Sequence, residues 1–145
     1  MASESPLSSL QVYSQFIASV PDQFPSVRRS TLTLYSVSPR HLVVRGDLEF
    51  GGGIRLRVAE RIDTARARMT WYSYAVLRGA EELYWYDPQP HPDDPSLVST
   101  FPHHKHVPPN IKRNRVPAPG ISFTRPNLPF VIHEVEKDVL GSETA

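Results

Sequence analysis

The stretch RHLVVRGDLEFGGGIRLRVAERI, residues 40–62, decides the fold. Apolar and polar residues alternate along it, both before and after three consecutive glycines at positions 51–53. Neighbouring side chains of an extended chain point to opposite faces, so this period of two predicts two β-strands. The glycines predict a tight turn between them. We therefore expect an antiparallel hairpin at the centre of the protein.

Three further strands extend this hairpin. STLTLYSV lies upstream at residues 30–37, and ARARMTWYSYAVL (65–77) and EELYWYD (81–87) lie downstream. Short connections between consecutive strands are typical of antiparallel pairing. The sequence therefore predicts a twisted antiparallel meander of about five strands over residues 30–87.

Each end of the chain carries a helical pattern. Apolar residues recur at helical spacing in residues 6–19, after Pro6, and again in residues 128–140. We expect both helices to cover one face of the sheet, which gives an α+β fold. At 145 residues the chain is expected to be one domain, residues 1–145.

The segment from 88 to 127 has a different texture, because proline recurs throughout it. Proline lacks the backbone N–H that a sheet needs. We therefore expect extended, turn-rich chain that cannot contribute to a central sheet and that crosses the sheet or its edge.

Composition excludes several classes of protein. The chain has no cysteine, so disulfides, iron–sulfur clusters and thiol nucleophiles are ruled out. No apolar run approaches the ~20 residues of a membrane span, and the N-terminus lacks the pattern of a signal peptide. A cytoplasmic protein without membrane contact is the simplest interpretation.

The net charge of +1 says little, but its distribution is informative. Residues 95–133 contain no Asp or Glu, and such a span has a positive field that attracts polyanions such as RNA. A solvated loop without acids is the alternative. The candidate nucleic-acid-binding residues are Lys112, Arg113, Arg115 and Arg125.

The sequence TFPHHKH, residues 100–106, holds three of the six histidines. In extended chain His104 and His106 face one way, and His103 and Lys105 face the other. Two imidazoles can serve as an acid–base pair on RNA while a cation stabilises the phosphate. The His-x-His spacing also suits a metal, with a third ligand from His91, Asp87 or Glu60, but Lys105 would repel a divalent cation. A solvated loop is the remaining alternative.

Glu60 breaks the alternation of its strand, because it shares a face with apolar residues. It is either a buried carboxylate with a partner and a shifted pKa, or a strand-end residue that reaches solvent. Tyr72 lies on one face of the next strand. Such aromatic side chains usually pack, although a hydroxyl directed at the histidines would favour a role in chemistry.

The chain resembles the TumE-type toxin family. The similar features are YSY (72–74), YD (86–87), PHP (90–92), TFPHHKH (100–106), the strand ending in VAERID (58–63) and the closing helix FVIHEVEKDVL (130–140). The resemblance covers roughly residues 30–106 and the last helix. It implies a toxin of a bacterial or archaeal toxin–antitoxin pair, a helix-turn-helix antitoxin as partner, and RNA cleavage as the expected activity.

Our leading hypothesis is a metal-independent endoribonuclease toxin without a cofactor, and a homodimer is left open. In this hypothesis His104 and His106 are the acid–base pair, and Lys105 or His103 contacts the phosphate. The residues expected to orient or assist are Glu60, Tyr72, Asp87 and His91. The alternatives are a non-catalytic module that binds nucleic acid or protein, and a histidine-ligated metal hydrolase.

Overall fold

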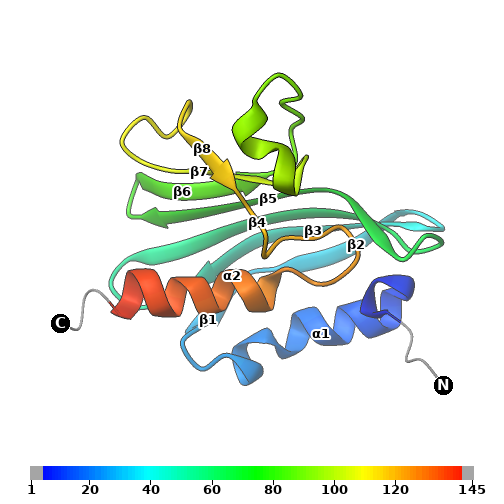
Figure 1. Cartoon of the computed structure of the whole chain (residues 1–145). Coiled ribbons are helices and arrows are strands. Elements are labelled where there is room, and N and C mark those ends of the chain that lie inside the picture. The colour runs from blue at the N-terminus through cyan, green and yellow to red at the C-terminus, as the bar shows by residue number, and fades with distance from the viewer. Residues whose placement is uncertain (1–4, 142–145) are drawn as a thin grey trace.

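The structure, a computed structural model, describes residues 5–141 and has an antiparallel sheet covered by two helices (Figure 1). Within this range the chain forms eight strands in the order β1-β3-β4-β5-β6-β7-β8, and β2 also pairs with β3. The strands are β1 (Arg29–Ser30), β2 (Thr33–Ser38), β3 (His41–Glu49), β4 (Ile54–Asp63), β5 (Arg68–Arg78), β6 (Glu81–Asp87), β7 (His104–His106) and β8 (Arg115–Pro117).

The predicted α+β class and the meander are confirmed, since β2 to β6 pair antiparallel with their neighbours in chain order. The central hairpin of β3 and β4 turns at the glycines, where Gly52 and Gly53 have φ of 70° and 75°. Positive φ is readily adopted only by glycine, which explains the turn at this point. The sheet is nevertheless larger than the predicted five strands.

The expectation that the proline-rich segment stays out of the sheet is wrong. β7 pairs with β6 on one side and with β8 on the other, so it is an internal strand. Its flanking prolines lie at 102 and 108, which leaves every residue of β7 with a backbone N–H to donate. β8 lies at the edge and ends in Pro117, where a missing donor costs little.

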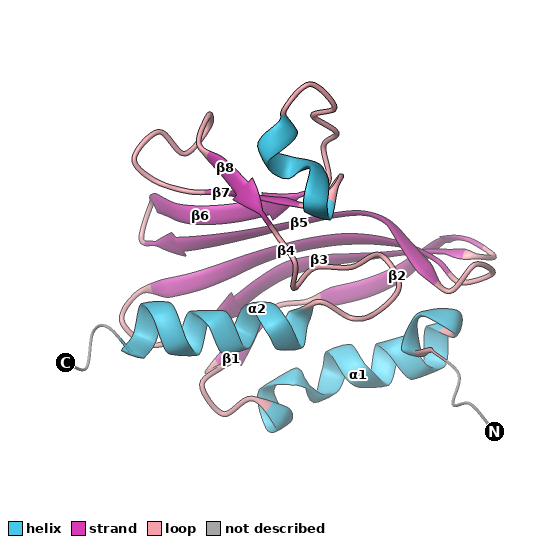
Figure 2. Ribbon diagram, in the orientation of Figure 1, coloured by secondary structure: helices cyan, strands magenta, loops and turns pink. Residues whose placement is uncertain are grey.

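Helical segments lie at both ends of the described chain, on the same side of the sheet (Figure 2). They are η1 (Pro6–Ser8) and α1 (Leu10–Gln23) near the start, and α2 (Leu128–Glu134) and the π-helical η3 (Val135–Leu140) near the end. A short 3-10 helix, η2 (Pro95–Thr100), lies between β6 and β7 in the sequence. α2 and η3 together span the predicted 128–140. No helix within residues 5–141 is both long and apolar enough to cross a membrane.

The first helix is displaced from its predicted range of 6–19. It begins after Ser9, whose side chain accepts a hydrogen bond from the Val12 N–H, and it continues past Pro21 to Gln23. A proline in the last turn removes a single donor, and the N–H of Phe24 still closes the turn on Val20. Burial of Val20 and Phe24 in the core favours this extra turn.

The core lies between the helices and one face of the sheet. On β4 the residues at even positions are buried, whereas the arginines at 55, 57 and 61 point to the opposite face. We call the side that packs on α1 and α2 the helix face, and the other side the open face. This division decides which candidate residues can act together.

Candidate functional site

The candidate site lies on the open face, where β6 and β7 pair. Their register places Asp87 opposite His104 and Trp85 opposite His106. Alternation along β7 turns the intervening Lys105 to the helix face. Asp87, His104 and His106, which we call the Asp87 cluster, are thereby brought together.

The side chains of the Asp87 cluster converge on one point. His104 Nε2 lies 3.1 Å from Asp87 Oδ1, and His106 Nε2 lies 3.2 Å from Asp87 Oδ2. The two Nε2 atoms are 3.1 Å apart. His104 is only 1% exposed and His106 6%, which rules out the alternative that these two histidines lie in a solvated loop. The added strand β8 and the stacked ring of Trp85 explain their burial.

Every member of the cluster is also held from outside. His104 Nδ1 lies 3.1 Å from the Pro102 carbonyl oxygen, and His106 Nδ1 lies 2.9 Å from that of Ile111. A carbonyl oxygen can only accept, so both Nδ1 atoms carry the hydrogen and donate it. Both Nε2 atoms therefore face the centre of the cluster as the second nitrogen of each ring.

The Asp87 carboxylate is fixed by two donors of its own. Trp85 Nε1–H donates to Oδ2 at 3.1 Å, and the Gln89 backbone N–H donates to Oδ1 at 2.9 Å. Burial alone would raise the pKa of this carboxyl, but the contact with His104, the Gln89 N–H and the histidine charges lower it to about 2. Burial also lowers the pKa of His106, which favours the neutral imidazole. The cluster is thus an ionised carboxylate facing two imidazoles.

A hollow adjoins the cluster, and His91 lies between the two. The His91 ring meets the His104 ring edge-on, with centroids 4.9 Å apart. The hollow has a volume of about 350 Å³, and its polar lining comes from His91, Asp93, Asp94 and Arg115. Arg115 stands opposite His106 in the β7–β8 register. The predicted residue His91 therefore belongs to this region, as does Arg115.

Lys105 and His103 lie on the helix face instead. Lys105 Nζ is 3.1 Å from Glu134 and sits over the ring of Tyr84. His103 stacks on Tyr72, and its Nδ1 is 2.5 Å from the Tyr72 hydroxyl. The Tyr72 hydroxyl is therefore directed at a histidine, but this histidine is His103. The structure does not bring Lys105, His103 or Tyr72 to the Asp87 cluster, which corrects the arrangement expected around His104 and His106.

Glu60 is buried on the helix face, which decides between its two interpretations. It is 1% exposed and accepts hydrogen bonds from Tyr13 and Tyr74, each at 2.5 Å. Burial raises its pKa, although the two hydroxyls oppose this shift. Sequence reasoning missed Tyr13, because helical spacing marks it only as a core position. Glu60 is not part of the Asp87 cluster.

The predicted nucleic-acid-binding residues are spread over two loops and β8. Lys112 and Arg113 are exposed in the loop between β7 and β8, and Arg115 is half-buried in β8. Arg125 is exposed in the connection to α2 and donates to the Gly120 carbonyl. Only Arg115 reaches the hollow beside His91.

Sequence reasoning missed the cations of the open face. Arg45, Arg57 and Arg61 are exposed there, and Trp71 beside them is 40% exposed. Their signal was present in the alternating pattern of β4, where the polar positions are arginines. Sequence reasoning also missed Trp85, which contacts both Asp87 and His106.

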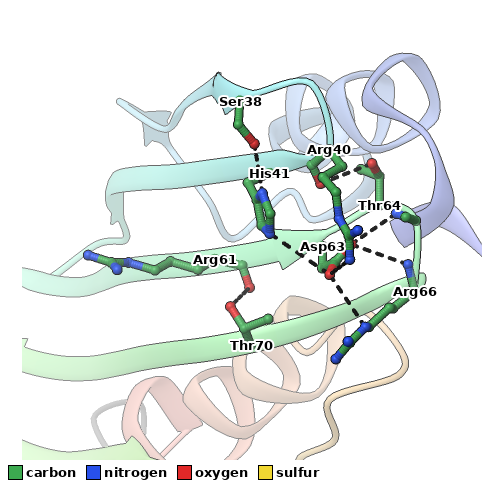
Figure 3. Close-up of polar contacts among 9 residues, drawn as sticks. Ser38, Arg40, His41, Arg61, Asp63, Thr64, Arg66 and Thr70 are labelled. Atoms are coloured by element: carbon green, nitrogen blue, oxygen red, sulfur yellow. Dashed lines mark hydrogen bonds and ion pairs between the residues drawn. The ribbon is translucent and has the colours of Figure 1, made fainter.

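A second polar network surrounds Asp63 at the end of β4 (Figure 3). Arg40 donates two hydrogen bonds to the Asp63 carboxylate, at 3.1 and 2.6 Å, and the backbone N–H groups of Ala65 and Arg66 donate two more. These bonds fix the turn into β5. Because these groups are already paired with one another, we assign the network a structural role.

Comparison with known proteins identifies a family. A family model described as Toxin TumE matches residues 16–139, which is most of the chain. No curated protein and no solved structure matches. The match includes both faces of the sheet and the whole Asp87 cluster.

Proposed function

Because this chain belongs to the TumE toxin family, we propose that it is a toxin that cleaves RNA, with the Asp87 cluster as its chemical centre. The observation that carries the proposal is the convergence of two buried imidazoles and an ionised carboxylate beside a hollow. Clusters of titratable groups with shifted pKa values are typical of functional sites.

A row of side chains on the open face supports RNA as the substrate. Arg57 pairs with Ala75, Ala75 with Trp85, Trp85 with His106, and His106 with Arg115. The row thus joins an exposed cation, a small residue, an aromatic ring, the cluster and a second cation. Single-stranded nucleic acid binds along cationic surfaces that also offer aromatic rings for stacking.

Cleavage of a phosphodiester needs one group that activates an oxygen nucleophile and another that stabilises charge on the phosphate. The convergent Nε2 atoms of His104 and His106 supply the first, either as a proton-transferring pair or as ligands of a metal ion. Arg115 takes the role first expected of Lys105, because it lies beside His106 whereas Lys105 is paired with Glu134.

Membership of a toxin family implies an antitoxin partner. We propose that this partner is a helix-turn-helix protein and that the pair acts in the cytoplasm, where its RNA target is found. A homodimer remains a prediction. Co-expression with the product of an adjacent gene, followed by measurement of the mass of the complex, tests both the antitoxin partner and the homodimer.

RNA degradation tests the function directly. Purified protein is incubated with end-labelled single-stranded RNA, and the wild type is compared with the double variant His104→Ala, His106→Ala. The matched control is His133→Ala, since His133 is exposed on α2, far along the chain from β7. We expect fragments from the wild type and the control only. Equal cleavage by the double variant contradicts the proposal, and RNA that is bound but intact favours a binding module.

A further inference from the structure

We propose that Asp87, His104 and His106 bind a divalent transition-metal ion, with open coordination positions on the side of His91. Among residues 5–141 these three offer ligand atoms that all lie within 4.8 Å of one another. The proposal goes beyond RNA cleavage, because it rests on the geometry of the cluster and holds for any chemistry performed there.

The hydrogen-bond pattern favours a cation at the centre. Both histidines donate from Nδ1 to backbone carbonyls, so in their neutral form each presents the Nε2 lone pair inward. The Asp87 oxygens at 3.1 and 3.2 Å are acceptors as well. Neutral imidazoles would leave three acceptors in mutual contact with no hydrogen between them, which is repulsive.

Protons satisfy this arrangement poorly. One proton on His104 Nε2 can bridge to Asp87, but His106 Nε2 would still face Asp87 Oδ2 as a second acceptor at 3.2 Å. Protons on both rings would place two N–H groups face to face at 3.1 Å.

A metal ion satisfies all three contacts at once. With metal–nitrogen and metal–oxygen bonds of about 2.0–2.2 Å and angles between 90° and 109°, ligand atoms lie roughly 2.9–3.5 Å apart. The three separations in the cluster are 3.1, 3.1 and 3.2 Å. The side chains therefore already stand at the spacing of one face of a coordination sphere.

The surrounding contacts are those of a metal centre. Ligating histidines usually donate the other ring N–H to a carbonyl or carboxylate, and ligating carboxylates are hydrogen-bonded in turn. Here His104 and His106 donate to the Pro102 and Ile111 carbonyls. Asp87 accepts hydrogen bonds from the Trp85 indole and from the Gln89 backbone N–H.

The structure also removes the objection that Lys105 would repel a cation. Lys105 projects to the helix face, where Glu134 neutralises it at 3.1 Å. Two imidazoles and one carboxylate suit Zn²⁺ and the neighbouring first-row ions better than Mg²⁺ or Ca²⁺, which prefer oxygen ligands. Three protein ligands with further positions open are typical of catalytic sites, where the ion lowers the pKa of a bound water.

Metal binding is tested on tag-free protein after dialysis against EDTA. Titration calorimetry with Zn²⁺ should give one equivalent bound per chain, and Mg²⁺ at the same concentration should give no heat of binding. The variants Asp87→Asn and His106→Gln should each lose the site, whereas His133→Ala should keep it. Circular dichroism tests whether each variant is folded. If a variant is unfolded, the Zn²⁺ titration of the wild type alone decides the proposal.

Co²⁺ provides a second readout, because its visible absorption bands report ligation by the imidazoles. We expect these bands in the wild type and in His133→Ala, and their loss in His106→Gln. Folded wild-type protein that binds no Zn²⁺, or a stoichiometry unchanged in both cluster variants, would overturn the proposal. Neither measurement uses RNA, so a failure of RNA cleavage and a failure of metal binding are distinguished.

Discussion

Replacing Glu60 tests the most unusual feature of the core, a carboxyl group enclosed by two tyrosines. Tyr13 on α1 and Tyr74 on β5 both donate to it, so Glu60 joins the helix to the sheet. In the Glu60→Ala variant both hydroxyls lose their acceptor. In the Glu60→Gln variant the volume is kept, the amide oxygen accepts one hydroxyl, and the amide N–H₂ contacts the other.

The magnitude follows from these contacts. A buried donor left without an acceptor costs about 1–3 kcal/mol, so Glu60→Ala should lose about 2–6 kcal/mol of unfolding free energy. A chain of 145 residues is expected to have roughly 7–22 kcal/mol in total. At a urea slope of about 2 kcal/mol/M the midpoint should fall by roughly 1–3 M. Glu60→Gln leaves at most one hydroxyl without an acceptor, so its loss of unfolding free energy should be smaller than that of Glu60→Ala by at least about 1 kcal/mol.

The difference between wild type and Glu60→Gln should also depend on pH. Burial raises the pKa of Glu60 in the folded state above its value in the unfolded chain. A raised pKa stabilises the folded protein below the unfolded value of about 4.3, and this contribution is lost as the pH rises through the folded value. Tyr13 and Tyr74 do not titrate in this range, because burial raises their pKa values well above 10. The advantage of the wild type should therefore shrink as the pH increases.

Urea unfolding of the three proteins at pH 4 and pH 8 measures both effects, and groups common to all three cancel in the differences. A loss below about 1 kcal/mol for Glu60→Ala would refute the reasoning that two buried hydroxyls depend on this carboxyl. A difference between wild type and Glu60→Gln that does not change with pH would refute the raised pKa.

Three further predictions follow from separate parts of the fold. Gly46 has a φ of 143°, and a Cβ there would lie 2.5 Å from a backbone oxygen between β1 and β2, so Gly46→Ala should lose more than about 2 kcal/mol in urea unfolding. Gly53→Ala is the matched control, because it has positive φ but open space around it, and an equal loss in both would contradict the steric argument. Hydrogen bonds from Arg40 lower the pKa of Asp63 to about 2. Asp63→Asn should therefore have a lower unfolding free energy than the wild type at pH 5, and this difference should disappear as the pH falls towards 2. A difference that persists at pH 2 would contradict the lowered pKa. Arg57→Gln should reduce the salt slope of single-stranded RNA binding by about 0.7, measured by fluorescence anisotropy, and an unchanged slope would remove Arg57 from the RNA path.

The meander could be predicted from sequence because apolar and polar residues alternate along most of it, and β4 and β6 bury alternate residues. β7 could not, since three residues give too short a pattern and the surrounding prolines argue against a strand. What places β7 inside the sheet is pairing with β6 and β8, which is a tertiary contact. The end of α1 was misplaced for a related reason: burial of Val20 and Phe24 outweighs the local effect of Pro21.

The candidate site was predictable in its residue types and only partly in its arrangement. Asp87 ends β6, and the sequence already marked it as a residue expected to assist the histidines. The burial of His104 and His106 was not predictable, because it depends on β8 and on Trp85. A sequence shows which side chains alternate, but not which strand will cover them.

The alternation within HHKH separates two kinds of chemistry that are adjacent in the sequence. His104 and His106 meet Asp87 on the open face, while Lys105 meets Glu134 on the helix face. A lysine between two ligands argues against a metal site only when all three side chains share a surface. Here the sheet itself separates them, and the Glu134 carboxylate neutralises the lysine. The residue that seemed to exclude a metal ion from this sequence therefore anchors α2 to β7, the strand that carries both histidines of the Asp87 cluster.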